Sequence, residues 1–159
     1  MSPAERAQLD AAYRRTLYEV QAPGGPMLLR IDEHCPALQA AHAQLAVSES
    51  VFMTAWNPQS APLCASRNAV AQARLDQRLA PLGLTVWPGW GRDPEGSWPA
   101  EQSLFVAGLE RERALQLARE FDQHAFVHAG PDAVPRLVWV SGSAGNDRPA
   151  APGTATSGS

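Results

Sequence analysis

The chain has 159 residues, of which 45% are hydrophobic and 18% charged, and its formal net charge at pH 7 is −3. This length and balance suit one globular domain with its own core, and the negative net charge argues against nucleic acid as a partner. No run of residues approaches the ~18 apolar positions that a membrane span needs, and the charged first residues do not resemble a secretory signal. We therefore expect a cytoplasmic protein without a membrane segment.

The first third of the chain predicts a helix, a hairpin, a second helix and a strand. The opening Ser-Pro-Ala-Glu is a capping box, which predicts a helix over 3–15. Strands are expected at 16–20 and 27–31, joined by the turn sequence Pro-Gly-Gly-Pro. Another helix begins at Pro36, and the run 51–56 is apolar on both faces, which is typical of a central strand.

The rest of the chain adds two helices and four strands. Ser66 is a suitable N-cap for the longest helix, which extends to Leu82 and is stopped by Gly83. The other expected elements are strands at 84–87, 103–107, 124–128 and 136–140, a helix at 109–121, and loops at 57–65 and 88–100.

This order of elements is neither a strict alternation of strand and helix nor two separate blocks. It predicts a single domain over residues 1–140 of class α+β (or α/β), with one mixed sheet of about six to seven strands packed by about four helices. Residues 141–159 are almost entirely Ser, Gly, Ala, Pro and Thr, a composition that predicts a disordered tail.

Metal and cofactor motifs are missing from the sequence. Cys35 and Cys64 form no C-x-x-C pair and are expected to be free and buried. His124 and His128 would lie ~13 Å apart on a strand, too far to share a metal ion. No glycine-rich phosphate loop, dinucleotide fingerprint, nucleophile elbow or zinc-protease motif occurs, so no cofactor is expected.

The candidate site lies where the strand 51–56 runs into the long helix. Trp56 and Asn57 end the strand, and helical spacing places Asn68 on the apolar face, at the first turn. The Asn68 amide could brace the loop that precedes it or bind a ligand. Arg67 could likewise form part of a solvated face or of an anion site beside the helix N-terminus.

Further candidates follow in the second half of the chain. Trp90, Arg92 and Trp98 lie in the expected 88–100 loop, where the tryptophans could cover a ligand or anchor the loop. Glu101 and Ser103 point to one face of the next strand, so Glu101 is either a general acid or base or a clamp for the preceding turn. Gln123 lies at the last junction from helix to strand.

Six short motifs occur together along residues 9–140. They are Ala12-Tyr13-Arg14, Thr54-Ala55-Trp56-Asn57-Pro58, Arg67-Asn68 with Arg74-Leu75, Gly91-Arg92-Asp93-Pro94 with Trp98, Glu101-Gln102-Ser103, and Phe121-Asp122-Gln123-His124-Ala125. In their order and spacing the chain resembles a bacterial family known as domain of unknown function 3293. The resemblance implies a small single-domain protein without an assigned activity. Asp122 stands where the family usually has glycine, a substitution that matters if this position is left-handed.

Three functions remain open from the sequence, and the choice between enzyme and binding protein is left undecided. The first is a small-ligand-binding or regulatory protein with a pocket formed by Trp56, Asn57, Asn68, Glu101 and the 90–98 loop. The second is a small hydrolase or transferase that uses Glu101 as acid or base on an anionic substrate. The third is a protein-interaction module that presents exposed tryptophans.

Overall fold

A curled sheet of seven strands forms the centre of the fold. The computed structural model describes residues 1–140, and the tail expected at 141–159 lies outside the described residues. The helices are α1 (Pro3–Arg15), α2 (Pro36–Leu45), α3 (Ala65–Leu79) and α4 (Arg111–Glu120), with short 3-10 turns η1 (Pro58–Ser60) and η2 (Ala80–Leu82). The strands are β1 (Leu17–Ala22), β2 (Gly25–Leu29), β3 (Ser50–Met53), β4 (Thr85–Arg92), β5 (Glu101–Ala107), β6 (Ala125–Ala129) and β7 (Pro135–Trp139).

The strand order in the sheet is β2-β1-β4-β5-β3-β6-β7, and every neighbouring pair is antiparallel. The α+β class, the four helices and the chain order of elements are confirmed, whereas the expectation of a mixed sheet is wrong. The helical crossovers through α3 and α4 do join parallel strands, but a third strand lies between the two in each case. β5 separates β3 from β4, and β3 separates β5 from β6, so no parallel neighbours arise.

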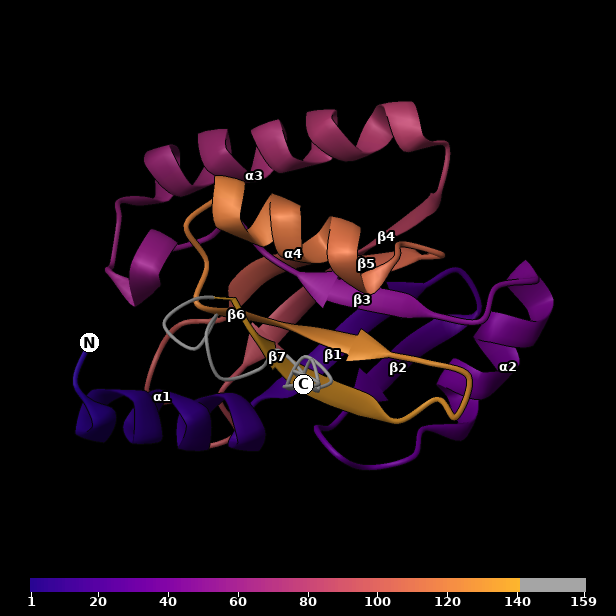
Figure 1. Ribbon diagram of the computed structural model, residues 1–159, viewed down its shortest axis with the longest axis horizontal. Helices are drawn as coiled ribbons and strands as arrows, with labels where there is room; N and C mark the ends of the chain where they lie inside the picture. Colours follow the sequence, from indigo (N-terminus) through magenta and orange to yellow (C-terminus); the bar gives the residue numbers. More distant parts are fainter. Residues whose placement is uncertain (141–159) are drawn as a thin grey trace, which may run out of the picture.

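The two faces of the sheet carry separate cores. Helices α3 and α4 cover one face, and Leu75, Leu79 and Leu117 pack there against Val51 and Val106 of the central strands (Figure 1). The other face holds a second cluster into which α2 inserts Leu38. Because both faces are covered at the centre, β3 is buried at every position, as its apolar sequence predicts.

The sheet curls until its two edges approach each other. The Asp32 N–H donates to the Pro135 carbonyl at 2.7 Å, and the Cys35 N–H donates to the Ala133 carbonyl at 3.0 Å. These bonds join the segment after β2 to the start of β7, so the second face is concave. Helix α1 lies across this side of the sheet, opposite α3 and α4 (Figure 1).

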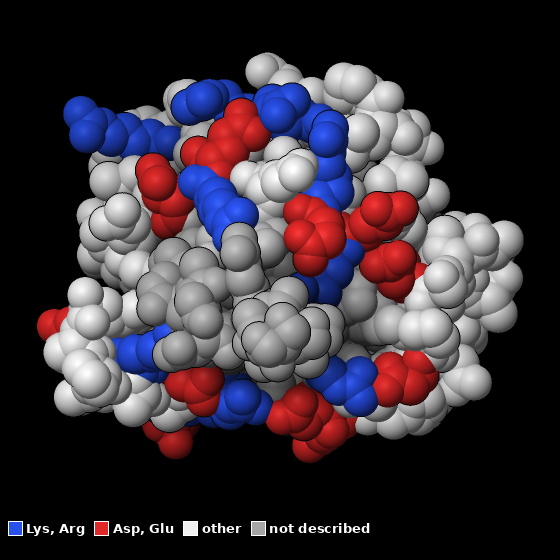
Figure 2. Space-filling view, in the orientation of Figure 1, with Lys and Arg blue, Asp and Glu red and all other residues white. Residues whose placement is uncertain are grey.

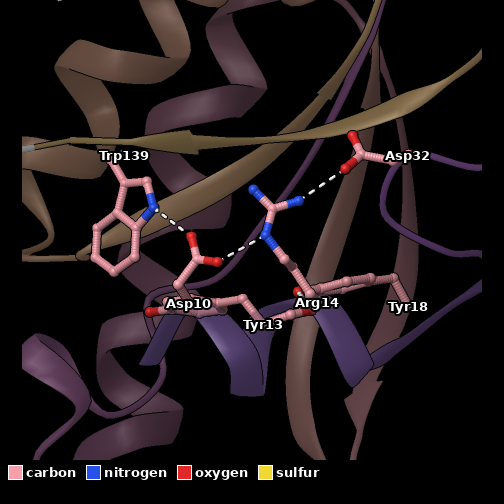
Figure 3. Close-up of polar contacts among 6 residues, drawn as sticks. All are labelled: Asp10, Tyr13, Arg14, Tyr18, Asp32 and Trp139. Carbon is pink, nitrogen blue, oxygen red and sulfur yellow. Dashed lines mark hydrogen bonds and ion pairs between the residues drawn. The ribbon is translucent and has the colours of Figure 1, made fainter. Parts of the chain in front are cut away.

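Polar and aromatic contacts hold α1 in place (Figure 3). Asp10 accepts a hydrogen bond from the Trp139 indole N–H at 3.1 Å and from Arg14 Nε at 2.6 Å. Arg14 also donates to Asp32 at 2.7 Å, and the Tyr13 ring meets the Trp139 ring edge to face at 5.7 Å. No residue of α1 is fully buried, so these contacts, more than a deep apolar face, dock the helix.

Strand β4 is longer than the sequence predicts. It extends to Arg92, so residues 88–92, expected in a loop, belong to the sheet, and only 93–100 are irregular. Proline at position 88 is tolerated because β1 pairs with β4 only from Gly89 onward. A Cβ atom on Gly89 would lie 2.6 Å from the Glu19 carbonyl oxygen and 2.8 Å from the Phe52 ring, so this crossing requires glycine.

Local corrections concern the start of α3, the second cysteine and the end of α4. Helix α3 begins after Cys64, two positions before the cap expected at Ser66, and Cys64 is exposed rather than buried. Asp122 follows α4 with a φ of 52°, which is the left-handed conformation that the usual glycine would adopt. Within residues 1–140, none of the helices has both the length and the apolar character to cross a lipid bilayer.

Candidate functional site

A cavity of about 550 Å³ lies on the concave face of the sheet beneath α1. Its apolar walls include Leu9 from α1, Phe52 from β3, Val127 from β6 and Leu137 from β7. The loops at 56–63 and 98–99 complete its rim. This volume lies in the ~300–1,000 Å³ range of pockets that hold small organic molecules.

Most of the residues singled out in the sequence meet at this cavity. Those that line it are Trp56, Asn57, Asn68, Trp98, Glu101, Ser103 and Gln123. They come from five separate stretches of chain: the loop after β3, the first turn of α3, the 93–100 loop, the start of β5 and the loop before β6. The cavity therefore brings together the corner, the tryptophan loop and the carboxylate at the entrance to β5.

Three of the expected residues lie elsewhere. Alternation along β4 turns Gly89 and Gly91 toward the concave side and turns Trp90 and Arg92 to the opposite face. There Arg92 Nε donates to Glu19 at 2.8 Å and the guanidinium lies 5.8 Å from the Trp90 ring centroid. Arg67 is exposed, because it is one position from Asn68 and so points about 100° away around the helix.

Two other arginines of α3 make contacts with α4 and the residue that follows it. Arg78 makes a bidentate contact with Glu120 of α4, with Nε 2.9 Å from Oε1. Arg74 lies with its guanidinium 5.7 Å from the Phe121 ring centroid. These two side chains tie α3 to α4. Figure 2 shows acidic and basic side chains interspersed on the face viewed.

The corner is held by a pair of amides. Asn68, with 1% of its surface exposed, accepts from the Asn57 N–H at 2.8 Å and donates to the Asn57 side-chain oxygen at 2.8 Å and the Leu63 carbonyl at 3.2 Å. These bonds use both N–H donors of its amide and one acceptor position of its oxygen, all with the preceding loop. They hold Asn57 at a φ of 46°, and Gln59 and Ser60 also have positive φ, so the loop stores backbone strain beside the cavity.

Glu101 receives its one side-chain hydrogen bond within the described chain from Asn57, whose Nδ2 donates to Oε1 at 3.1 Å. Burial raises the pKa of the Glu101 carboxyl, and the Asn57 bond offsets part of that rise. The carboxyl in turn raises the pKa of two phenols that line the same cavity, Tyr13 and Tyr18, beyond the larger rise that burial causes. The Glu101 carboxyl, a protonatable group, thus lies in a largely apolar cavity. It is the last member of a series of hydrogen bonds that runs from Asn68 through Asn57.

Backbone contacts fix the remaining polar groups of the rim. Gln123 Nε2 donates to the Trp56 carbonyl at 3.2 Å, and the Gln59 N–H donates to the Asp122 carbonyl at 2.7 Å. Ser103 donates to the Glu101 carbonyl at 3.2 Å. These residues position the rim more than they offer free groups to a ligand.

Sequence reasoning missed the contribution of α1. Tyr13 and Thr16 line the cavity, and the Tyr18 hydroxyl reaches back from β1 to donate to the Tyr13 carbonyl at 2.7 Å. The spacing of Leu9 and Tyr13, four positions apart, is a signal that could have identified the face of α1 that packs against the rest of the protein. Nothing in the local sequence shows where that partner lies, because it includes Trp139 at the other end of the described chain.

The part of the chain that the structure describes contains no group of three or more His, Cys, Asp or Glu side chains arranged to hold a metal ion. Comparison with known families found a match: the model described as a protein of unknown function, DUF3293, matches residues 53–126. Neither the curated proteins nor the solved structures gave a match. The matched segment runs from the end of β3 through the start of β6 and so contains most of the cavity rim but not α1.

Proposed function

Because residues 53–126 belong to the DUF3293 family of unknown function, we propose a function from the cavity itself: the protein binds one small organic molecule beneath α1. The observation that carries this proposal is the convergence of residues from α1, from the central strands and from the surrounding loops on one cavity of about 550 Å³. A ligand that binds the folded protein in this cavity would stabilise the fold. A regulatory role fits the same site. We also propose that the protein acts in the cytoplasm.

Catalysis by Glu101 on an anionic substrate has weaker support. Burial raises the pKa of Glu101, which is the direction that favours a general acid. An anionic substrate needs a cation, however, and neither Arg67 nor Arg92 lines the cavity. A binding role therefore accounts for more of the arrangement than this reaction does.

An interaction module built on tryptophans also has little support. Trp87 stacks on Phe105 with ring centroids 5.4 Å apart, and Trp139 contacts Tyr13 of α1. The large apolar side chains that are exposed, such as Leu28 and Val70, come from separate elements. Scattered apolar side chains of this kind are normal on protein surfaces.

The test is to fill the cavity from its α1 wall. Ala12 lines the cavity, whereas its neighbour Ala11 is exposed on the same helix. The neutral fluorescent probe N-phenylnaphthylamine should bind wild type and Ala11→Phe alike, and Ala12→Phe should bind it at least about tenfold more weakly. Circular dichroism and melting temperature would verify that both variants fold. Absence of probe binding by wild type, or equal binding by both variants, would overturn the proposal.

A further inference from the structure

The cavity has an unusual charge composition. Among the side chains of residues 1–140 that line it, Glu101 alone carries a formal charge, and none is a Lys, Arg or His. Within the described residues Glu101 takes part in no ion pair, and its hydrogen-bond donor, Asn57, is neutral. Arg15 of α1 is directed to other partners. Its Nε lies 3.8 Å from Asp93 Oδ1, and its guanidinium lies 5.1 Å from the Trp98 ring centroid.

An unpaired carboxylate in such a place is costly. Removing a charge from water without a counter-ion is unfavourable, and the protein can avoid this cost by protonating the group or by acquiring a cation. Residues 1–140 supply no cation to the lining of this cavity, and a ligand that carries a positive charge would supply one.

The surroundings of Glu101 suit a positive charge in a second way. Tyr13, Tyr18, Phe52, Trp56 and Trp98 all line the cavity. Glu101 lines the same cavity as these five rings, and its charge contributes to the raised pKa of the Tyr13 and Tyr18 phenols, after the larger effect of burial. Aromatic faces attract organic cations, and this attraction is strongest where water is excluded.

We propose that the ligand is an organic cation, an ammonium group on a mainly apolar body, whose charge pairs with Glu101 among the aromatic side chains of the cavity. This assignment rests on the proposed binding function and specifies its ligand class. The apolar walls formed by Leu9, Val127 and Leu137 would hold the body of the molecule. The Asn57 amide would keep the carboxylate turned toward the ammonium group.

The test compares three probes of the same shape with different head groups: phenethylamine, phenylethanol and phenylacetate. Each would be titrated at neutral pH against wild type, Glu101→Gln and Glu95→Gln, with displacement of N-phenylnaphthylamine as the readout. Glu95→Gln is the matched control. It removes the same charge as Glu101→Gln, but from an exposed position on the 93–100 loop. We expect wild type and Glu95→Gln to prefer phenethylamine at least about tenfold over phenylethanol, and Glu101→Gln to lose that preference.

The outcomes separate the two proposals. If the neutral probe binds but phenethylamine competes no better than phenylethanol or phenylacetate, the cation assignment is wrong while the binding cavity stands. A protonated Glu101 that donates to a neutral ligand would give this result. Retention of the amine preference in Glu101→Gln would also overturn the assignment. Failure of the neutral probe to bind wild type would instead overturn the proposed function, and the cation assignment with it.

Discussion

Asn57 and Asn68 form a two-way amide pair in which the Asn68 oxygen accepts the Asn57 backbone N–H at 2.8 Å and the Asn68 nitrogen donates to the Asn57 side chain at 2.8 Å. The pair fixes the side chain of Asn57, whose own nitrogen then reaches Glu101 at 3.1 Å. The first turn of helix α3 therefore controls the position of the Glu101 carboxylate on strand β5. Asn68 acts on the cavity through another residue, which makes it a positioning residue.

Asn68→Ala should destabilise the protein by about 2–3 kcal/mol, because it leaves buried polar atoms of Asn57 and Leu63 without their partner. Chemical denaturation of the purified variant would measure the loss. Arg67→Ala, at the exposed neighbouring position, should stay within about 0.5 kcal/mol of wild type. A similar small effect for both variants would show that the amide pair does not hold the corner.

Glu101→Gln should change how stability depends on pH. The folded protein holds the Glu101 proton more tightly than the unfolded chain, because burial raises its pKa above the ordinary 4.5. As pH rises from the pKa of Glu101 in the unfolded chain to its higher pKa in the folded protein, the free energy of unfolding of wild type falls. The glutamine variant has no such charge, so it should match wild type in acid and be more stable at neutral pH. Denaturant titrations across this window, with Glu95→Gln as control, would detect a constant difference if Glu101 did not cause the effect.

Asp122→Gly should stabilise the protein by about 1 kcal/mol. Asp122 has a φ of 52°, a conformation that costs energy for any residue with a side chain and none for glycine. Asp122→Ala retains the steric cost and provides the comparison. Thermal unfolding should therefore place the glycine variant above wild type and the alanine variant at or below it. The reverse order would mean that the Asp122 side chain compensates for the strain.

Asp10→Ala should loosen α1 without unfolding the domain. The substitution removes the acceptor for both Arg14 and the Trp139 indole N–H, contacts worth about 1 kcal/mol together at a partly exposed position. Amide hydrogen exchange in α1 should become faster while the core strands keep their protection. Gln8→Ala, exposed on the same helix, is the control. Unchanged exchange in α1 would indicate that the aromatic contacts alone dock the helix.

The two cysteines should differ in reactivity toward an aromatic disulfide reagent. Cys64 is exposed, and hydrogen bonds from the Ser66 hydroxyl and the Arg67 backbone N–H lower the pKa of its thiol. Cys35 is buried. The native protein should therefore release one equivalent of reporter thiol, and Cys64→Ser should abolish it until denaturant exposes Cys35. A second fast equivalent in the native state would contradict the burial of Cys35.

The sequence predicted those features that depend on local periodicity. The spacing Asn68–Leu75–Leu79 placed the Asn68 amide on the buried face of α3, and alternation placed Glu101 and Ser103 on one face of β5. Prediction failed where distant pairing overrides local preference. Pro88, Gly89 and Gly91 all favour a loop, yet pairing with β1 and β5 keeps them in a strand and thereby turns Trp90 away from the cavity.

The contact between Asp10 and the Trp139 indole also bears on how the protein is made, because its partners are 129 positions apart in the chain. Helix α1 precedes every other described element in the order of synthesis, yet its docking partner belongs to β7, the last of them. Long-range closure of this kind slows folding, and a nascent chain still lacking β7 has no Trp139 side chain against which Asp10 and Tyr13 can pack. The contacts between α1 and Trp139 therefore form only after β7 has been translated, and the α1 wall of the cavity lacks this support until then.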